Sequence, residues 1–461
     1  MPAPPYKIWE LMERANTGPF CEDEKFTMDV LMPKLKEVIA KYGIAYDPAT
    51  PVPADDALAD AVWQAGVELF RDVGVLNVDT HRIIRFDQAE IEEALYLAQG
   101  EYLVGAGKDA RPLRHRRVED SMPPFCIFSP DITCDEEYFL PISIAYLREP
   151  LADGVCAPIL EETMGLKIKA GAPTELAGCI EHAMSLREAA KLVGRPGIFL
   201  VAVGTAESDT GQISVSNDQW GVRITDSRLV GALTELKIDN ELLNKAIHCQ
   251  QFGCFIGSLT GPIYGGYAGR AEGTAVLQVA YHLMGLLVHQ AHYQMNFPFH
   301  LHYTSNSGRE MLWVVSVSHQ AVARNSRLVS LSNGFLNAGP CTEMVLYEAT
   351  AHGLASAVSG AHLWEAAVAH NKYRNRATPL EARMAAEVGH AAARMGLGRE
   401  QANEIVLKLL AKYEDKIKDA PLGKEFQECY DIRKAVPTQE YLDLYKRVKE
   451  EVAGLGIEFP Y

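Results

Sequence analysis

The sequence lacks several patterns that define common protein classes. No GxGxxG follows a predicted strand and no GxxxxGK[ST] occurs in the 461 residues, which weakens a nucleotide-binding role. The nine cysteines are scattered without a CxxC pair, and this indicates reduced thiols rather than a disulfide framework. Basic residues are few, since 44 Lys and Arg stand against 60 Asp and Glu, for a formal charge of −16. This balance gives no electrostatic footprint for nucleic acid or an anionic membrane.

Targeting segments and membrane-spanning runs are also missing. The N-terminal sequence MPAPPYKIWE has neither a charged n-region nor an apolar h-region, so we expect no signal peptide. The most apolar long run, residues 276–293, contains three histidines and two glutamines, which is typical of a buried helix and not of a membrane span. No internal repeat or low-complexity linker is evident. We therefore expect a cytoplasmic protein with neither a membrane nor a nucleic acid as partner.

What the chain does have is apolar content, 48% of its residues, in an ordered pattern. We expect an N-terminal helical layer over residues 1–100, an α/β barrel core over 101–375 and C-terminal helices completing the barrel over 376–461. Strand and helix patterns alternate after residue 125, which predicts a parallel sheet. A TIM (β/α)8 barrel with additional terminal helices is our first choice, and a doubly wound open sheet is the alternative. The expected strands are 125–129, 154–159, 198–203, 254–258, 299–303 and 328–332, and the helices between them include 175–194, 271–293 and 307–324.

Two kinds of side chain are candidates for chemistry. His300 and His302 are two residues apart on an expected strand, so they point to the same face as metal ligands, proton donors or packed polar groups. Zinc would need a third ligand such as Cys254 or Glu235, and we favour a hydrogen-bonded pair without metal. Glu235 lies between a loop and a helical stretch. If its carboxyl is buried there, it can act as a general acid or base; if it is solvated, it only pairs with a neighbouring lysine.

A glycine-rich loop follows another expected strand. Gly265, Gly266 and Tyr267 precede a helical pattern, and such a loop brings backbone N–H groups close to a ligand. A tight turn between strand and helix is an equally good interpretation of the same residues. The spacing is not that of a phosphate-binding loop.

A series of short segments, taken together, carries a resemblance. They are DTHRI (79–83), GRPG (194–197), ELKID (235–239), PIYGGYAG (262–269), AGPCTEM (338–344), LEARMAAEV (380–388), GKEFQECYD (423–431) and PTQEY (437–441). In this order they resemble the monomethylamine:corrinoid protein methyltransferases of methanogens. The resemblance implies a TIM barrel, a homo-oligomer and a corrinoid protein as partner. The Co(I) of that partner would accept a methyl group at the open end of the barrel.

The resemblance also marks where this chain departs from the family. The strand after GRPG carries pyrrolysine in the family, whose imine ring is taken to bind and orient methylamine, and this position falls on Val201. A family glutamate falls on Leu259, and a glutamine and a tyrosine fall on Asn333 and Phe335. From that set only the glutamate of ELKID, Glu235, is kept. The electrophile and most polar groups around the amine are therefore replaced.

These departures predict a different methyl donor. Val201, Leu259 and Phe335 would form an apolar cup, with Asn333 and Tyr264 beside it, that suits a donor with apolar faces. We predict O-demethylation of a methoxylated aromatic compound by the Co(I) of a corrinoid protein, because a phenolate leaves more readily than an amide anion. A proton donor, or a metal, would act at the ether oxygen, and the loop would face the corrinoid. The proton donor would be Glu235, His300 or His302, and the loop residues would be Gly265, Gly266 and Tyr267.

Two alternatives stay open at this stage. A quaternary or tertiary amine such as a betaine already has a neutral leaving group, and it would need an aromatic cage and a group that binds its carboxylate. A scaffold that binds the corrinoid protein and has lost catalysis is the other. The two pocket histidines and the retained Glu235 favour an enzyme.

Overall fold

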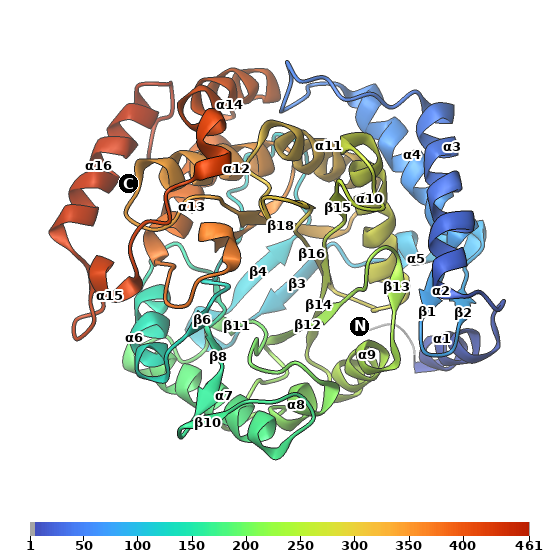
Figure 1. Cartoon of the computed structure of the whole chain (residues 1–461), viewed down its shortest axis with the longest axis horizontal. Coiled ribbons are helices and arrows are strands. Elements are labelled where there is room, and N and C mark those ends of the chain that lie inside the picture. Colours follow the sequence, from blue (N-terminus) through green and yellow to red (C-terminus); the bar gives the residue numbers. More distant parts are fainter. Residues whose placement is uncertain (1–4, 461) are drawn as a thin grey trace.

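The computed structural model describes residues 5–460, and at its centre eight parallel strands form a barrel (Figure 1). Hydrogen-bonded neighbours run in the order β11-β7-β5-β19-β18-β16-β14-β12. A parallel bridge between Val201, directly after β11, and Ser227 in β12 joins the two ends of this sheet. The strands are β5 (Cys126–Phe128), β7 (Gly154–Val155), β11 (Phe199–Leu200), β12 (Ser227–Gly231), β14 (Phe255–Thr260), β16 (Tyr293–Asn296), β18 (Val329–Phe335) and β19 (His362–Ala367).

Each barrel strand is followed by a helix, which confirms the predicted TIM barrel over the open sheet. Local sequence explains where these helices begin and end. In the last of them Thr378 caps the N-terminus in a capping box with Glu381, Pro379 takes the first turn, and Gly396 ends the helix with a φ of 63°. The helices are α6 (Glu136–Leu147), α7 (Pro173–Leu192), α8 (Asp209–Ser214), α9 (Asn240–Phe252), α10 (Ala271–Leu287), α11 (Arg309–Asn325), α12 (Glu343–Val358) and α13 (Pro379–Met395).

The two ends of the chain add layers on the outside of this ring (Figure 1). The N-terminal part packs through α4 (Asp56–Val73) on α10 and α11, and the C-terminal part packs through α14 (Arg399–Tyr413) and α16 (Gln439–Ala453) on α12. The other N-terminal elements are α1 (Pro5–Thr17), α2 (Asp23–Lys25), η1 (Phe26–Leu31), α3 (Met32–Tyr42), β1 (Val75–Asn77), β2 (Arg82–Ile84) and α5 (Gln88–Leu97). The other C-terminal elements are η4 (Glu414–Asp419), α15 (Phe426–Cys429), β20 (Tyr430–Asp431) and β21 (Val436–Pro437).

A hairpin covers the amino end of the barrel. It consists of β3 (Glu101–Val104) and β4 (Arg111–Arg114), joined through η2 (Gly107–Asp109). The backbone N–H groups of Gly105 and Ala106 donate to the carbonyls of Thr225 and Gly197 at 2.9 and 2.7 Å, and these acceptors lie just before the barrel strands β12 and β11. Val104 and Leu113 of the hairpin are fully buried in the same cluster as the barrel interior. Access to the interior is therefore left to the carboxyl end, where TIM barrels place their chemistry.

One expected strand is wrong. The barrel strand that follows α10 is β16 (Tyr293–Asn296), not the expected 299–303, because α10 ends at Leu287 instead of continuing to residue 293. The expected strand 299–303 keeps only two residues of strand, β17 (Phe299–His300), which pairs with β15 (Ile263–Tyr264) outside the barrel sheet. Runs this short do not separate strand from turn by apolar content alone.

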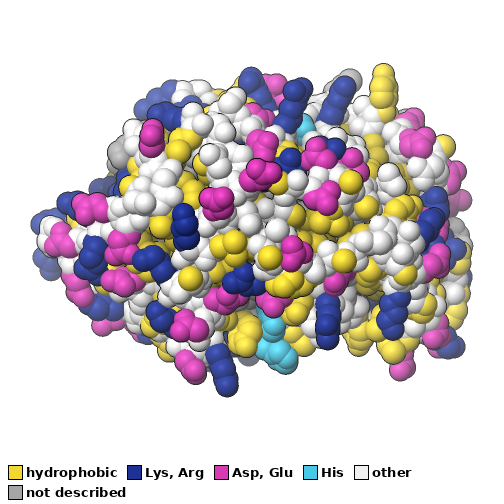
Figure 2. All heavy atoms as spheres, turned by 90° about the horizontal axis from the view of Figure 1, so that it is seen from above, with side chains coloured by type: hydrophobic (Ala, Val, Ile, Leu, Met, Phe, Trp, Pro, Cys, Tyr) yellow, Lys and Arg dark blue, Asp and Glu magenta, His cyan; other side chains and the backbone are white. Residues whose placement is uncertain are grey.

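The surface carries charges of both signs. On the face seen in Figure 2, Lys and Arg side chains are interspersed with Asp and Glu, and apolar atoms lie between them. Within residues 5–460 we find no helix with the length and apolar character needed to cross a bilayer.

Candidate active site at the carboxyl end of the barrel

Val201 lies at the carboxyl end of the third barrel strand. Its backbone N–H donates to the Val155 carbonyl at 3.1 Å, and its side chain is fully buried in the cluster that fills the barrel interior. The next residue, Ala202, has a φ of 60°, a left-handed conformation that costs a residue with a Cβ about 1–2 kcal/mol. The strand that the sequence singled out thus places an inert aliphatic side chain inside the barrel, close to its carboxyl end.

Apolar and aromatic side chains surround this end. Leu259 on β14 pairs in register with Met295 on β16, and both belong to or pack against the interior cluster. Phe297 stacks on Phe335 with ring centroids 5.5 Å apart, and Phe299 lies 6.5 Å from Phe335. The rings of Phe297, Phe299 and Phe335 therefore lie together, while Val201 and Leu259 belong to or pack against the cluster in the barrel interior. The apolar cup of Val201, Leu259 and Phe335 stays a prediction.

A buried polar pair lies among these apolar groups. Asn333 on β18 is 1% exposed, and its Nδ2 donates to Oδ2 of Asp131 at 3.0 Å. Ser129 Oγ donates to the other oxygen of Asp131, and burial raises the pKa of this carboxyl. Asp131 was not among the residues that sequence reasoning selected. The available signal was its place directly after an expected strand, where the carboxyl ends of parallel strands meet.

Glu235 lies apart from this pair. Its two carboxyl oxygens accept hydrogen bonds from the Ile263 backbone N–H at 3.1 Å and the Tyr281 hydroxyl at 2.9 Å. The residue is 0% exposed and lies between the loop after β12 and helix α10, and burial raises its pKa to about 7. The neighbouring Leu236 belongs to the cluster formed with the N-terminal helices, and not to the barrel interior. In this arrangement Glu235 ties loop segments to α10.

The two histidines lie in a turn beyond β16. His300 and His302 have ring centroids 5.6 Å apart, and the backbone N–H of His302 donates to His300 Nδ1 at 3.1 Å. They do not share a strand face as expected, because the chain turns directly after His300. Tyr264 and Tyr303 lie 5.0 Å and 4.5 Å from the His300 ring, and burial lowers the pKa of His300.

The zinc hypothesis finds no support. Cys254 directly precedes β14 at the amino end of the barrel, whereas His300 and His302 follow the carboxyl end of β16, so these three do not form one site. Cys254 Sγ contacts the Cys249 carbonyl in a separate buried cluster. Across the described part of the chain, no group of three or more His, Cys, Asp or Glu side chains is arranged to hold a metal ion.

The glycine-rich loop is a self-bonded turn. The N–H of Gly265 donates to the Gly269 carbonyl at 2.7 Å, and the N–H of Gly266 donates to Ile263 at 3.0 Å. Gly265 has a φ of 84°, which favours glycine at this position. Because these N–H groups are used within the loop, they are not free to hold an anion. Tyr267, 50% exposed, projects its ring toward solvent.

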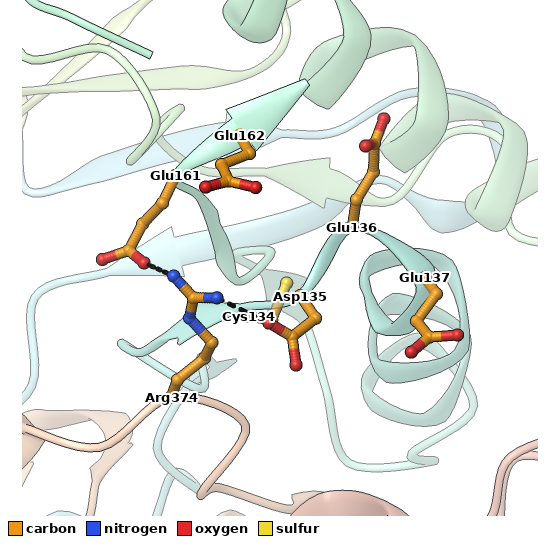
Figure 3. Close-up of a pocket in the computed structure, with 7 residues that line it drawn as sticks. All are labelled: Cys134, Asp135, Glu136, Glu137, Glu161, Glu162 and Arg374. Atoms are coloured by element: carbon orange, nitrogen blue, oxygen red, sulfur yellow. Dashed lines mark hydrogen bonds and ion pairs between the residues drawn. The ribbon is translucent and has the colours of Figure 1, made fainter. Parts of the chain in front are cut away.

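An acidic recess of about 210 Å³ lies near the carboxyl end, where β6 (Thr133–Cys134) and β8 (Ile159–Leu160) pair (Figure 3). Arg374 donates to Asp135 at 2.7 Å and to Glu161, and both contacts are drawn in Figure 3. The recess is lined by Cys134, Asp135, Glu136, Glu137, Glu161, Glu162 and Arg374. Its cation is thus already engaged by carboxylates of the chain.

Comparison with known proteins decides the family. The family model described as monomethylamine methyltransferase MtmB matches residues 6–457, nearly the whole chain. The chain belongs to the monomethylamine methyltransferase family. Among curated members, MtmB1 of Methanosarcina barkeri is 30% identical and MtmB1 of Methanosarcina acetivorans is 31% identical, each across 98% of this chain and 99% of the relative.

Solved structures agree with the family assignment. The crystal structure of the Methanosarcina barkeri monomethylamine methyltransferase superposes with a TM-score of 0.95 at 30% identity, over 98% of each chain. The crystal structure of the hydroxylamine MtmB complex matches equally well, with a TM-score of 0.95. Val201, Leu259, Asn333 and Phe335 thus lie within a methyltransferase fold shared along nearly the full length.

Proposed function

We propose that this chain transfers a methyl group from a methoxylated aromatic compound to the Co(I) of a corrinoid protein. The observation that carries the proposal is Val201, an aliphatic side chain fully buried in the barrel interior at the position where the resembled family has pyrrolysine. Without an imine electrophile the protein cannot activate methylamine in the family's way. The methyl donor must bring its own leaving group.

The surroundings support an aromatic donor. Phe297, Phe299 and Phe335 lie within 6.5 Å of one another, and Leu259 and Met295 add aliphatic surface beside them. Aromatic rings bury large apolar faces and favour a ring-shaped partner. Stacked neutral rings also exclude water, which strengthens polar interactions at the reacting oxygen.

Leaving-group chemistry supports the same donor class. Displacement of methyl from an aryl ether by Co(I) leaves a phenolate, whereas displacement from a neutral amine would leave an amide anion. The phenolate is a far weaker base, so a single proton donor suffices. The corrinoid is supplied by the partner protein, and we expect the chain to act as a homo-oligomer, as the resemblance implies.

A quaternary or tertiary amine is the second candidate. The relatives are named as monomethylamine methyltransferases, and the rings of Tyr264, His300 and Tyr303 lie together at the carboxyl end, which favours a cation. Such a donor leaves as a neutral amine and needs no proton donor. Arg270, an exposed cation near Tyr264, is available for the carboxylate of a betaine. We place this candidate second because Val201 and the cluster of Phe297, Phe299 and Phe335 offer an apolar site.

The test is a donor panel with chemically reduced cob(I)alamin as acceptor, followed by the visible spectrum as Co(I) becomes methyl-Co(III). We expect methylation from 2-methoxyphenol and 4-nitroanisole, and none from methylamine. Turnover of glycine betaine alone would establish the second candidate. Turnover of methylamine would contradict both, and no turnover with any donor would indicate a binding scaffold. A separate measurement tests zinc. If the metal content of His300→Ala and His302→Ala equals that of the wild type, these histidines are not zinc ligands.

A further inference from the structure

Asp131 differs from the other carboxyls near the barrel end in its accessibility. It keeps part of its surface exposed, whereas Glu235 and Glu348 are both 0% exposed. Asp131 follows β5 directly, so it lies at the carboxyl end of the first barrel strand. Asp131 is thus the least enclosed of these three residues, although its carboxyl group itself is buried at the barrel end.

The hydrogen-bond partners of Asp131 are neutral. Ser129 and Asn333 donate to its two oxygens, and within the described residues no ion pair joins it to a Lys, Arg or His. Burial is the largest influence on its pKa and raises it, while the hydrogen bonds from Ser129 and Asn333 and the nearby indole of Trp364 lower it. Among the described side chains, the titratable groups that interact with it are Cys156, directly after β7, and Tyr146 on α6, both neutral at pH 7 because burial raises their pKa values. A carboxyl in such surroundings holds a proton more tightly than a solvated aspartate.

Asn333 supplies an unused acceptor beside this acid. Its Nδ2 is bonded to Asp131 and lies 3.9 Å from Met295 Sδ, but its Oδ1 has no hydrogen-bond partner although the residue is 1% exposed. A buried acceptor left unsatisfied costs about 1–3 kcal/mol. An incoming hydroxyl group would remove that cost. The pair thus offers a proton donor and, next to it, an acceptor for a hydroxyl.

We propose that Asp131 donates the proton to the leaving oxygen and that Asn333 Oδ1 binds a hydroxyl beside the methoxy group, as in a 2-methoxyphenol. This assignment rests on the proposed function. The carbon–oxygen bond breaks with its electron pair staying on oxygen. The lone pair of Co(I) forms the new cobalt–carbon bond, giving methyl-Co(III), and the proton of Asp131 passes to the oxygen to release a phenol. Asp131 is left as a carboxylate and regains a proton from water.

The test compares donors whose leaving groups differ in basicity. In Asp131→Asn we expect kcat/KM for 2-methoxyphenol to fall by about 10²–10⁴-fold, the usual contribution of a general acid. With 4-nitroanisole, whose phenolate leaves without help, the loss should stay below about tenfold, since little proton transfer is needed. Asp135→Asn, four residues away, is the matched control and should keep both activities.

The outcomes separate this inference from the function on which it rests. Equal losses with both donors, or no loss, would show that Asp131 is structural while the O-demethylase function stands. If the wild-type chain methylates cob(I)alamin from no methoxyarene, the proposed function falls and the acid role falls with it.

A second variant tests the pair independently of Asp131→Asn. Asn333→Leu should reduce the preference for 2-methoxyphenol over anisole by about tenfold or more, the value of one hydrogen bond to a buried group. An unchanged preference would overturn the role of Asn333. Thermal melts of each variant establish that the protein assayed is folded.

Discussion

Two aspartates four residues apart, Asp131 and Asp135, have opposite electrostatic surroundings. Asp131 lies inside the barrel end with neutral donors, and burial raises its pKa. Asp135 lies in the acidic recess of Figure 3, where hydrogen bonds from Asn375 and Arg374 hold its pKa below the ordinary value. The difference shows that the partners and burial of a carboxyl, more than its position along the chain, decide how tightly it holds a proton.

The two aspartates also differ in how they connect segments of the chain. Arg374 uses its guanidinium to join Asp135 and Glu161, which links the segment after β19 to the segments after β5 and β7. Asp131 is joined to a distant strand by the hydrogen bond from Asn333 on β18, with the indole of Trp364 on β19 close to it. A carboxyl fixed by a cation and several donors is a tie between segments. A carboxyl that is bonded only to neutral donors can still form a hydrogen bond with a ligand.

Glu348 should give the largest effect among the carboxyls. It is 0% exposed and accepts hydrogen bonds from Ser307 Oγ, Asn337 Nδ2 and the backbone N–H groups of Asn337 and Ala338. Glu348→Ala would leave these donors unpaired in the loop after β18, so we expect a loss of about 3–5 kcal/mol in the free energy of unfolding. A thermal melt measures it.

The matched control for that variant is Glu451→Ala. Glu451 pairs at the surface with Lys412 and Tyr347, and exposed pairs contribute less than about 1 kcal/mol. If the two variants lowered the melting temperature equally, the distinction between a buried, fully bonded carboxyl and a paired surface carboxyl would not hold in this protein.

The sequence predicts much of the barrel because strand–helix alternation is a physical signature. The expected helix 307–324 matches α11 closely, since its apolar residues recur at helical spacing. The strand at 293–296 was missed because its residues, YQMN, alternate polar and apolar side chains, and Gln294 and Asn296 are buried against helices. A polar residue buried behind the sheet removes the apolar run by which a parallel strand is predicted.

The site was predicted less completely, and for a different reason. The resemblance supplied Val201, Leu259, Asn333 and Phe335, which the structure places at or near the carboxyl end of the barrel. Asp131 has no motif around it, and its environment arises only when β18 lies near β5 across β19. Contacts between residues 202 positions apart depend on closure of the barrel, which no local pattern contains.

Glu235 should have an effect of intermediate size on the free energy of unfolding, and this effect should depend on pH. Burial raises its pKa to about 7 from 4.5, so the folded state favours the protonated form. Its contribution to stability is full below about pH 4.5 and is lost as the pH rises through 7. Glu235→Gln keeps a neutral group, so at pH 8 we expect it to be more stable than the wild type by about 1–3 kcal/mol, with little difference at pH 4.5.

Melts of both proteins across this pH range measure the difference, with the exposed Glu404→Gln as the matched control expected to follow the wild type. A gap between wild type and Glu235→Gln that does not change with pH would contradict the neutral form of Glu235. If Glu235→Gln instead lost turnover with both methoxyarene donors, Glu235 would take part in catalysis, as the sequence predicted.

Asp135→Asn should have the smallest effect and the opposite sign. The lowered pKa of Asp135 means that its carboxylate stabilises the fold above about pH 4 and loses this contribution as the pH falls through the folded value. Because its side chain is 39% exposed, we expect Asp135→Asn to lower stability at pH 7 by less than about 1 kcal/mol, and less again in 1 M salt. Asp131→Asn should instead gain stability relative to the wild type as the pH rises, because the amide replaces a carboxyl that resists ionisation. Melting temperatures of Asp131→Asn and Asp135→Asn, relative to the wild type, measure both effects. If the two variants changed in the same direction with pH, the two aspartates would not differ as described, and Asp131 would lose its assignment as the proton donor.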